Sequence, residues 1–434
     1  MRSATSLAAL LGVLLAPGVS GALTLDEAIE QALQRNETVG IAEARIAQAR
    51  AQRRIALSRL LPQVGARGTW TLREEITREI AGERQVVQPS SSLGAQVTGA
   101  MQLIDPAAIP LITAASRDAR AEALASEDLL RTLAFDVARS YVQVLATEAV
   151  AEAAARRVAV AEEALAIARE RLAAGLTNRN DVTRTELTLS DARLARTNAV
   201  EAVRFARIAL GYLLAAPIES ELAPPSLPVP ALDAPATSLA EEARGRRPDL
   251  RSLELRTEAA DARDDEPWLR LLPSLDLQAA WRITDQAGFT GSETDWNVTF
   301  GLNWEIYDGG RRYGEAALLS AQTRELRLQT AGFARQVDRE IAEALVGVET
   351  ARVAAEEAAL RARVAQQNEE EVVARFEAGL ATALEQADAI TQRFEAEAEA
   401  VREAFQLEVE SLALRAALGL WPLETKPGSG EERG

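Results

Sequence analysis

The stretch NVTFGLNWEIYDGG, residues 297–310, combines two patterns that decide the fold. Apolar and polar residues alternate strictly over its first ten positions, which is the period of a β-strand with one apolar and one polar face. About ten residues is also the length of a tilted strand that crosses a bilayer. The alternation stops at Asp308-Gly309-Gly310, where a charged, alanine-rich region begins. The stretch therefore predicts a membrane-type strand that meets a helix at a hinge, with Asp308 as the helix cap.

A less regular copy of this stretch, GAQVTGAMQLIDPA (94–107), belongs to an internal repeat. Two further pairs of segments match in the same order and at nearly the same spacing. LLPQVGARGTW (60–70) matches LLPSLDLQAAW (271–281), and RLAAGL (171–176) matches RFEAGL (375–380). Ordered matches at one spacing indicate a duplicated plan. In the first copy, Asp105-Pro106 stands where the second copy has its Asp-Gly-Gly hinge.

The chain divides into four parts. Residues 1–22 predict a secretory signal peptide, because Arg2 precedes a short apolar core and Ser20-Gly21-Ala22 forms a small-x-small cleavage site. The apolar core is shorter than a membrane-spanning helix, and an uncleaved anchor is the alternative. Residues 23–225 form the first repeat, 226–425 the second repeat with its proline-rich connector, and 426–434 a flexible tail.

Each repeat contains two alternating strands, of which the first begins after Pro62 or Pro273. Half-buried strands of a soluble sheet would show the same local pattern. The secretion signal and the aromatic residues near the strand ends favour a membrane sheet, because such aromatics form interfacial girdles. The residues expected to face lipid are Trp70, Trp281, Trp296, Phe300 and Trp304.

The rest of the chain predicts helices of unusual length. The run 111–174 contains no proline or glycine and, with its first turn, would form a helix about 100 Å long. Large residues such as Val158 and Leu165 recur every seven positions with small residues three positions later, which predicts close left-handed coiled-coil packing. Gly175 and Gly379 are expected to end the long helices in the left-handed conformation. The expected helices are 111–174, 181–211, 312–378 and 384–418.

Composition excludes several classes of function. The chain has no cysteine, which removes disulfides, thiol catalysis and cysteine-type zinc sites. It also has no histidine, the side chain most suited to acid–base chemistry near neutral pH and the commonest metal ligand. We therefore expect no enzyme, no cofactor and no metal site. The net charge of −17 argues against binding to nucleic acid.

Four strands are too few to close a membrane barrel, because the smallest single-chain barrels use eight. One chain would leave its strand edges unpaired in lipid. Three copies would supply twelve strands and a closed ring. The same threefold arrangement would gather the long helices beneath that ring.

The chain resembles the TolC-type outer membrane factor family over nearly its whole mature length. The segments that carry the resemblance are LTLDEAIEQALQRN (23–36), both LLP strand starts, WEIYDGGRR (304–312), RLAAGLTNRNDVTRTE (171–186) and RFEAGLATALEQAD (375–388). The resemblance implies a mainly α fold with transmembrane β-strands, built from a duplicated repeat. Long antiparallel coiled-coil helices would form a trimeric α-barrel, and four strands per protomer would complete a twelve-stranded β-barrel in the outer membrane.

The resemblance also implies a location and a function. Such proteins lie in the bacterial outer membrane, extend into the periplasm and act as passive exit ducts of tripartite efflux pumps or type I secretion systems. Their partners are two further copies of the chain, outer membrane lipid, a periplasmic adaptor, and an inner-membrane pump or ABC transporter. An equatorial region is expected at 213–240 and in the carboxy-terminal segment.

In this family, rings of acidic residues just after the hairpin turns constrict the periplasmic entrance. Glu385 and Asp388 match these positions, and Asp181 matches the equivalent turn of the first copy. Ala381 stands where the family example has a gate arginine, so the sequence departs from the family's latch. Three symmetric carboxylates around a narrow axis would attract cations and repel anions. The alternative is that these are ordinary acids at a helix start, where they favour the helix dipole.

The two hairpin turns resemble the surface on which the family's adaptors dock. The residues expected there are Gly175, Leu176, Gly379 and Leu380. The simpler alternative is that these residues only shape the turns. A periplasmic coiled-coil adaptor or scaffold is a second functional class, since it would also be secreted, helical and rich in alanine. Such a protein needs one helical hairpin and no paired amphipathic strands, so the duplicated strands argue against it.

Overall fold

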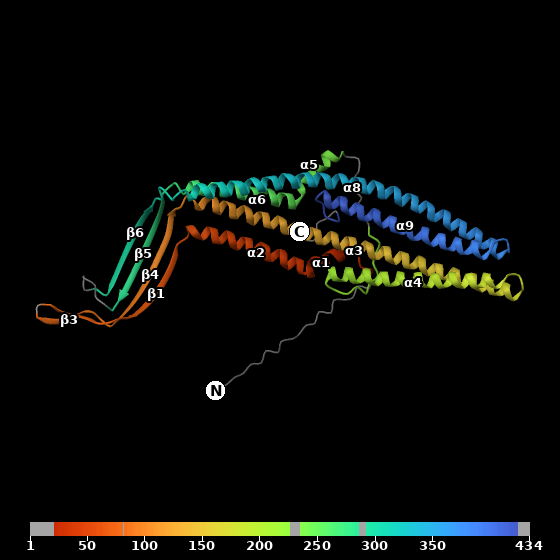
Figure 1. The fold of residues 1–434 in the computed structure, drawn as a ribbon, viewed down its shortest axis with the longest axis horizontal. Helices are drawn as coiled ribbons and strands as arrows, with labels where there is room; N and C mark the ends of the chain where they lie inside the picture. Colours follow the sequence, from red (N-terminus) through yellow and green to blue (C-terminus); the bar gives the residue numbers. More distant parts are fainter. Residues whose placement is uncertain (1–20, 81, 226–234, 286–291, 424–434) are drawn as a thin grey trace, which may run out of the picture.

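The computed structural model describes residues 21–80, 82–225, 235–285 and 292–423. It is a long rod of helices with a β-sheet at one end (Figure 1). The expected signal peptide, apart from its last two residues, lies outside the described residues, as do the tail 426–434 and most of the proline-rich connector.

Four antiparallel strands form the sheet in the order β1-β4-β5-β6. The register joins the apolar faces of all four strands into one face, since Val97 lies opposite Trp281, and Trp281 lies opposite Trp296. Trp70 continues this face through its pairing with Leu93. The two parities expected from the sequence are therefore confirmed. The strands are β1 (Gln63–Leu72), β4 (Ser91–Ile104), β5 (Ser274–Thr284) and β6 (Thr294–Asn303).

The last strand ends earlier than the alternation predicts. Residues 304–306 continue the pattern, but β6 ends at Asn303, which pairs with Ser274. The residue before Ser274 is Pro273, which has no N–H to donate to a further rung of the sheet. Trp304 instead lies beyond the strand, and its indole N–H donates to the Leu271 carbonyl oxygen at 2.9 Å.

A second, two-stranded sheet was not predicted. β2 (Ile76–Ile80) and β3 (Glu83–Gln88) form a hairpin between β1 and β4 that extends beyond the main sheet (Figure 1). Gly82 has a φ of 86°, a conformation that glycine adopts without strain. The sequence predicted only two strands in each repeat, because this hairpin lacks a clean two-residue period.

Two long helical hairpins form the end of the rod opposite the sheet. They are α3 (Ala108–Ala173) with α4 (Arg179–Leu214), and α8 (Arg311–Glu377) with α9 (Ala383–Ala417). α3 contacts both α4 and α9, so the helices form a layer in the order α4-α3-α9-α8 (Figure 1). At about 1.5 Å per residue, α3 is about 100 Å long, as expected.

Shorter helices continue this layer toward the sheet. α2 (Glu37–Leu57) packs on α3, and α6 (Pro248–Asp264) packs between α3 and α8. The short helices η1 (Ser58–Leu60) and α7 (Glu266–Leu269) precede β1 and β5. Both copies therefore follow one plan of short helix, two strands and a long hairpin, which confirms the duplication. No helix in the described part of the chain is long and apolar enough to cross a membrane.

The middle of the rod carries two further helices and the largest core. α1 (Leu25–Arg35) packs against α3 and α4, and α5 (Ala236–Arg246) packs against α8. Leu23 forms a parallel bridge with Leu222, which attaches the amino-terminal segment to the segment that follows α4. The same core includes Leu222 after α4 and Trp421 and Leu423 near the carboxy-terminal end, so α1 packs together with the described parts of the segments expected to be equatorial.

The heptad pattern of α3 packs as predicted. Val158, Ala161, Leu165 and Ala168 are buried and share one core cluster with residues of α4. The boundary expected at Gly211 is wrong, because α4 continues to Leu214 and ends at Ala215 with a φ of 51°. Gly211 lies inside the helix, where an added Cβ would be 3.0 Å from the Ala216 carbonyl oxygen.

Candidate functional site

The tips of the two hairpins are built in the same way. Gly175 and Gly379 have φ values of 71° and 79°, as expected for glycines that end helices. Each glycine N–H donates to the carbonyl three residues earlier, and the next N–H donates five residues back, from Leu176 to Arg171 and from Leu380 to Arg375. These paired bonds satisfy the last carbonyls of α3 and α8 and leave Leu176 and Leu380 exposed, at 77% and 71%.

The helices that follow the tips begin with side-chain caps that involve two of the expected gate residues. The Asn178 side chain accepts a hydrogen bond from the Asp181 N–H at 3.0 Å, and the Thr177 hydroxyl donates to the Asp181 carboxylate at 2.5 Å. Thr382 and Glu385 form a reciprocal capping box, in which the Thr382 N–H donates to the Glu385 carboxylate at 2.7 Å. Both carboxylates are therefore part of the helix starts.

Hydrogen bonds from Thr382 set the ionisation of Glu385. The Thr382 backbone N–H and hydroxyl both donate to its carboxylate, which lowers the pKa of Glu385. Asp388 lies one turn further along α9 and is exposed, with no hydrogen bond or ion pair to any residue that the structure describes. The three expected gate residues thus lie at the same end of the rod, and Asp388 is the one whose carboxylate has no partner within the chain.

Arg171 links the two hairpin tips, a role that no sequence pattern indicated. Its guanidinium donates to the Glu377 carbonyl oxygen at 2.8 Å and lies 4.8 Å from the centre of the buried Phe376 ring. Both contacts cross from α3 to the end of α8. Arg171 and Phe376 lie within the matched RLAAGL and RFEAGL motifs, but only the three-dimensional structure brings them together.

The hinge between sheet and helix contains a buried ion pair. Gly309 and Gly310 have φ values of 73° and 89°, and the Asp308 carboxylate accepts hydrogen bonds from the backbone N–H groups of Gly310 and Arg312. The Arg312 side chain is 2% exposed and pairs with Asp308 at 3.1 Å. These bonds from Arg312 and Gly310 lower the pKa of Asp308. The Asp308 carboxylate therefore accepts an N–H of the first turn of α8, although the N-cap position itself is Gly310 and not Asp308 as expected.

The first copy has a simpler hinge. The Asp105 carboxylate accepts a hydrogen bond from the Ala107 N–H at 3.1 Å, and Pro106 takes the place of a glycine. α3 begins at Ala108, three positions before the predicted start. Pro110 falls in the first turn of α3, where a missing N–H breaks no bond within the helix.

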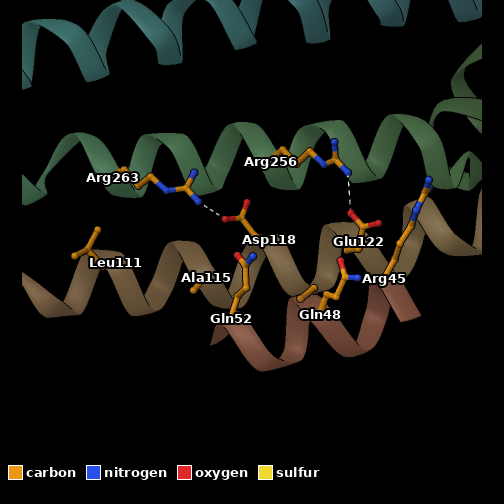
Figure 2. Close-up of a pocket in the computed structure, with 10 residues that line it drawn as sticks. Arg45, Gln48, Gln52, Leu111, Ala115, Asp118, Glu122, Arg256 and Arg263 are labelled. Atoms are coloured by element: carbon orange, nitrogen blue, oxygen red, sulfur yellow. Dashed lines mark hydrogen bonds and ion pairs between the residues drawn. The ribbon is translucent and has the colours of Figure 1, made fainter. Parts of the chain in front are cut away.

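A polar groove lies where α2, α3 and α6 meet (Figure 2). It has a volume of about 570 Å³ and is lined by residues such as Arg45, Gln48 and Gln52 of α2. Arg256 of α6 pairs with Glu122 of α3 at 3.0 Å, and Arg263 pairs with Asp118. The pairs connect the second copy to the first, so the groove is a charged seam between the two repeats.

Four of the five aromatic residues that were expected to face lipid share one side of the sheet. The side chains of Trp70, Trp281, Trp296 and Phe300 are all largely exposed in the single chain. The register places these four residues on the common apolar face, whereas Trp304 lies beyond the end of β6. In the described residues, no group of acidic side chains is arranged to hold a metal ion.

Comparisons with known proteins agree with this architecture. A model of the outer membrane efflux protein family matches residues 28–216 and 239–420. The pyoverdine export outer membrane protein OpmQ of Pseudomonas aeruginosa is 28% identical over 324 residues, which are 70% of this chain and 66% of OpmQ, just under two thirds of its length. The outer membrane protein OprJ of the same organism is 26% identical over 412 residues, which are 90% of this chain and 83% of OprJ.

Solved structures show the same fold. The outer membrane protein VceC from Vibrio cholerae superposes with a TM-score of 0.76 at 19% identity, over 92% of this chain and 97% of VceC. The family model matches residues of both repeats, and the superposition on VceC covers 92% of this chain. This chain belongs to the outer membrane efflux protein family.

Proposed function

We propose that three copies of the chain close into a channel-tunnel that serves as the exit duct of a tripartite efflux pump or type I secretion system. The observation that carries the proposal is the four-stranded sheet, which has one continuous apolar face and two edge strands, β1 and β6, that pair on their outer side with no strand of the described residues. An edge left unpaired in lipid costs several kcal/mol for each unsatisfied backbone group. Association with further copies removes that cost.

The antiparallel order supports closure of the ring. β1 and β6 run in opposite directions, so β6 of one protomer can pair with β1 of the next in the same antiparallel manner. Three protomers then supply twelve strands, an even number that suits a membrane barrel. The contact is head-to-tail and uses two different edges, which is the type of interface that closes into rings.

The outer helices of the rod support the same arrangement. α4 and α8 form the two edges of the helical layer, and both carry large apolar side chains on the surface. In a soluble monomer, such apolar surfaces mark an interface. The exposed residues are Leu187, Leu194, Val200, Phe205, Ile208 and Tyr212 on α4, and Leu318, Leu328, Val346, Val353, Leu360 and Val364 on α8.

The hairpin tips fit the two roles that the family resemblance implies. Asp181, Glu385 and Asp388 would form acidic rings at the periplasmic entrance, of which the Asp388 ring has the least partnered carboxylates. Gly175, Leu176, Gly379 and Leu380 would present two apolar tips to the hairpins of a periplasmic adaptor. With Ala381 in place of a gate arginine, Arg171 is the cation that joins the two tips.

A passive duct needs no catalytic group. The chain contains neither histidine nor cysteine, and the described residues offer no metal cluster, so we propose that it is not an enzyme and requires no cofactor. Energy and cargo selection would come from the inner-membrane pump or ABC transporter. A periplasmic adaptor or scaffold is the weaker candidate, because it would leave the apolar face of the sheet without lipid.

Cell fractionation with unheated gels tests the proposal. We expect the protein in the outer membrane fraction as a detergent-stable trimer that migrates as a monomer only after heating. Trp296→Asp should prevent insertion, because it places a charge on the apolar face. Asn297→Asp, on the polar face of the same strand, is the matched control. A soluble monomer in the periplasm would contradict the duct and favour the adaptor.

A further inference from the structure

The polar face of the main sheet holds all of the sheet's charges, and three of the four lie in one row. The strands of this sheet contain four charged residues, Arg67, Asp276, Arg282 and Asp295. In the register, Arg67 lies opposite Gln96, Gln96 opposite Arg282, and Arg282 opposite Asp295. Neighbouring strands are about 4.8 Å apart, so this row crosses the whole sheet perpendicular to its strands. Asp276 lies near the hinge end, opposite Gly301.

The rows on either side contain no further cation. On the hinge side, the next row of this face consists of Gly65, Thr98, Ala280 and Asn297. On the other side it consists of Thr69, Gly94 and Thr284, and the Thr284 N–H donates to the carbonyl oxygen of Glu293, which lies just before β6. Arg67 and Arg282 are therefore the only cationic side chains in the four strands of the main sheet.

The two arginines differ from the two arginines of α6 that line the polar groove. Arg256 and Arg263 are paired with carboxylates of α3. Arg67 and Arg282 are exposed, and in the described part of the chain neither forms an ion pair, although Asp295 is the direct neighbour of Arg282. A guanidinium has five N–H donors in a planar fork that matches the oxygens of carboxylates and phosphates. Both arginines are therefore free to bind an anion.

We propose that Arg67 and Arg282 of three protomers form a cationic collar in the barrel lumen that binds multivalent oxyanions. The inference rests on the proposed duct, because the polar face becomes a lumen only when three chains close the sheet. Each protomer adds two guanidinium groups and one carboxylate to the row, so the collar is net positive. A ring of like charge with low-dielectric walls concentrates ions of the opposite sign.

The collar gives the duct two filters of opposite sign. The hairpin tips at the expected periplasmic end carry acidic residues, whereas the collar lies in the sheet at the other end of the molecule, from the middle of β1 to the outer ends of β5 and β6. Anionic groups of a solute would be disfavoured at the tips and bound at the collar. The collar therefore attracts anionic groups on the exit side, and multivalent anions outside the cell would enter it and obstruct the pore.

Channel recordings of the purified trimer test the collar. Tripolyphosphate or citrate is added to the compartment on the β-sheet side of the channel, and the resulting block of the KCl current is measured. We expect both anions to block the wild-type pore, and Arg67→Gln with Arg282→Gln to weaken the block by about tenfold or more. Asp295→Asn should strengthen the block, because it removes the negative charge of the row. Trimers on unheated gels show that each variant is assembled.

Arg78→Gln is the matched control. Arg78 lies on the β2–β3 hairpin, outside the main sheet, and the same change of charge there should leave the block unaltered. Pores that form normally but show an equal block with and without Arg67 and Arg282 would overturn the collar and leave the duct intact. A loss of block in Arg78→Gln equal to that of the collar variant would also overturn it. Absence of pores in the wild-type protein would overturn the duct and the collar together.

Discussion

Tyr141 fixes the amino-terminal segment to the middle of the rod. Its side chain is fully buried, and its hydroxyl lies 2.6 Å from the carbonyl oxygens of both Leu23 and Ala223. The single hydroxyl proton is shared between two acceptors. Burial raises the pKa of Tyr141 to about 12, because the phenolate form would lose its hydration.

Tyr141→Phe should lower stability by about 1–3 kcal/mol, because it removes the hydroxyl donor from the Ala223 carbonyl oxygen, whereas the Leu23 carbonyl oxygen keeps the Ala223 N–H. The folded pKa is above the unfolded value of about 10, so the contribution of the neutral phenol is complete below pH 10. It is lost as the pH rises from about 10 to about 12. Thermal unfolding followed by circular dichroism between pH 8 and pH 12 should show this step in the wild type and lack it in Tyr141→Phe. Tyr307→Phe, at an exposed tyrosine beyond the end of β6, is the control and should behave like the wild type.

Glu385 allows the charge of the gate to be separated from the helix cap. Glutamine can also complete a capping box, so Glu385→Gln should keep the start of α9 and remove the charge, whereas Glu385→Ala should lose both. La³⁺ is added on the side of the hairpin tips, and its block of the KCl current is measured. The double variant Glu385→Gln with Asp388→Asn should weaken this block by about tenfold. Glu371→Gln, on the exposed surface of α8, is the control. An unchanged block in the double variant would contradict the gate.

The capping box also gives Glu385 a pH dependence of known sign. The folded pKa is lowered, so the bonded carboxylate stabilises the start of α9 above the unfolded value of about 4.3. This contribution is lost as the pH falls through the folded pKa. Glu385→Gln and Glu385→Ala therefore separate the gate role of Glu385 from its capping role, since only the cap depends on the bond to Thr382.

At the scale of elements, the seam between α3 and α4 depends on small residues. Ala161 is 1% exposed and lies in the cluster with Val158 and Leu165. Ala161→Leu should destabilise the hairpin by about 1–3 kcal/mol, because the larger side chain forces the helices apart. Ala155→Leu, at an exposed position of the same helix, should have little effect. Melting temperature and resistance to limited proteolysis at the tips measure the difference, and equal behaviour of the two variants would argue against close packing.

The hairpin tips are the elements that would meet an adaptor. Leu380→Asp and Gly379→Pro should impair export without preventing trimers, because they change an exposed apolar turn that contributes no core. Val87→Asp places the same charge on an exposed residue of the β2–β3 hairpin, at the other end of the molecule, and should leave export unaltered. The measurement is the susceptibility of the native host to a panel of dyes and antibiotics. Normal export in both tip variants would rule out docking at the tips.

The elements show what local sequence determines and what it leaves open. The alternation around Trp281 predicts its face, because a side-chain period of two is a property of the strand alone. The end of β6 depends on Pro273, which precedes the neighbouring strand β5, and α4 continues past Gly211, so neither boundary follows from the local pattern. The link from Arg171 to Phe376 joins residues about two hundred positions apart, which no periodicity reveals.

At the scale of the molecule, the single chain is an open structure with two pairs of edges. They are β1 and β6 of the sheet, and α4 and α8 of the helical layer. β1 and β6 are separated by β4 and β5, so their Cα atoms lie about 14 Å apart at three strand spacings. A disulfide requires Cα atoms within about 7 Å, so no cysteine pair on these two strands can close within one chain. Because the sequence contains no cysteine, introduced cysteines have no native partner.

Cysteines on the two edge strands therefore report on ring closure. Asn297→Cys in β6, combined in turn with Gly65→Cys or Thr69→Cys in β1, places both thiols on the polar face. In the combination whose register matches, oxidation should yield covalent dimers and trimers on denaturing gels and nothing larger, because the third bond closes the ring. Either cysteine alone should give no covalent trimer. A ladder beyond three chains would indicate an open assembly, and monomers in both combinations would contradict pairing between β1 and β6.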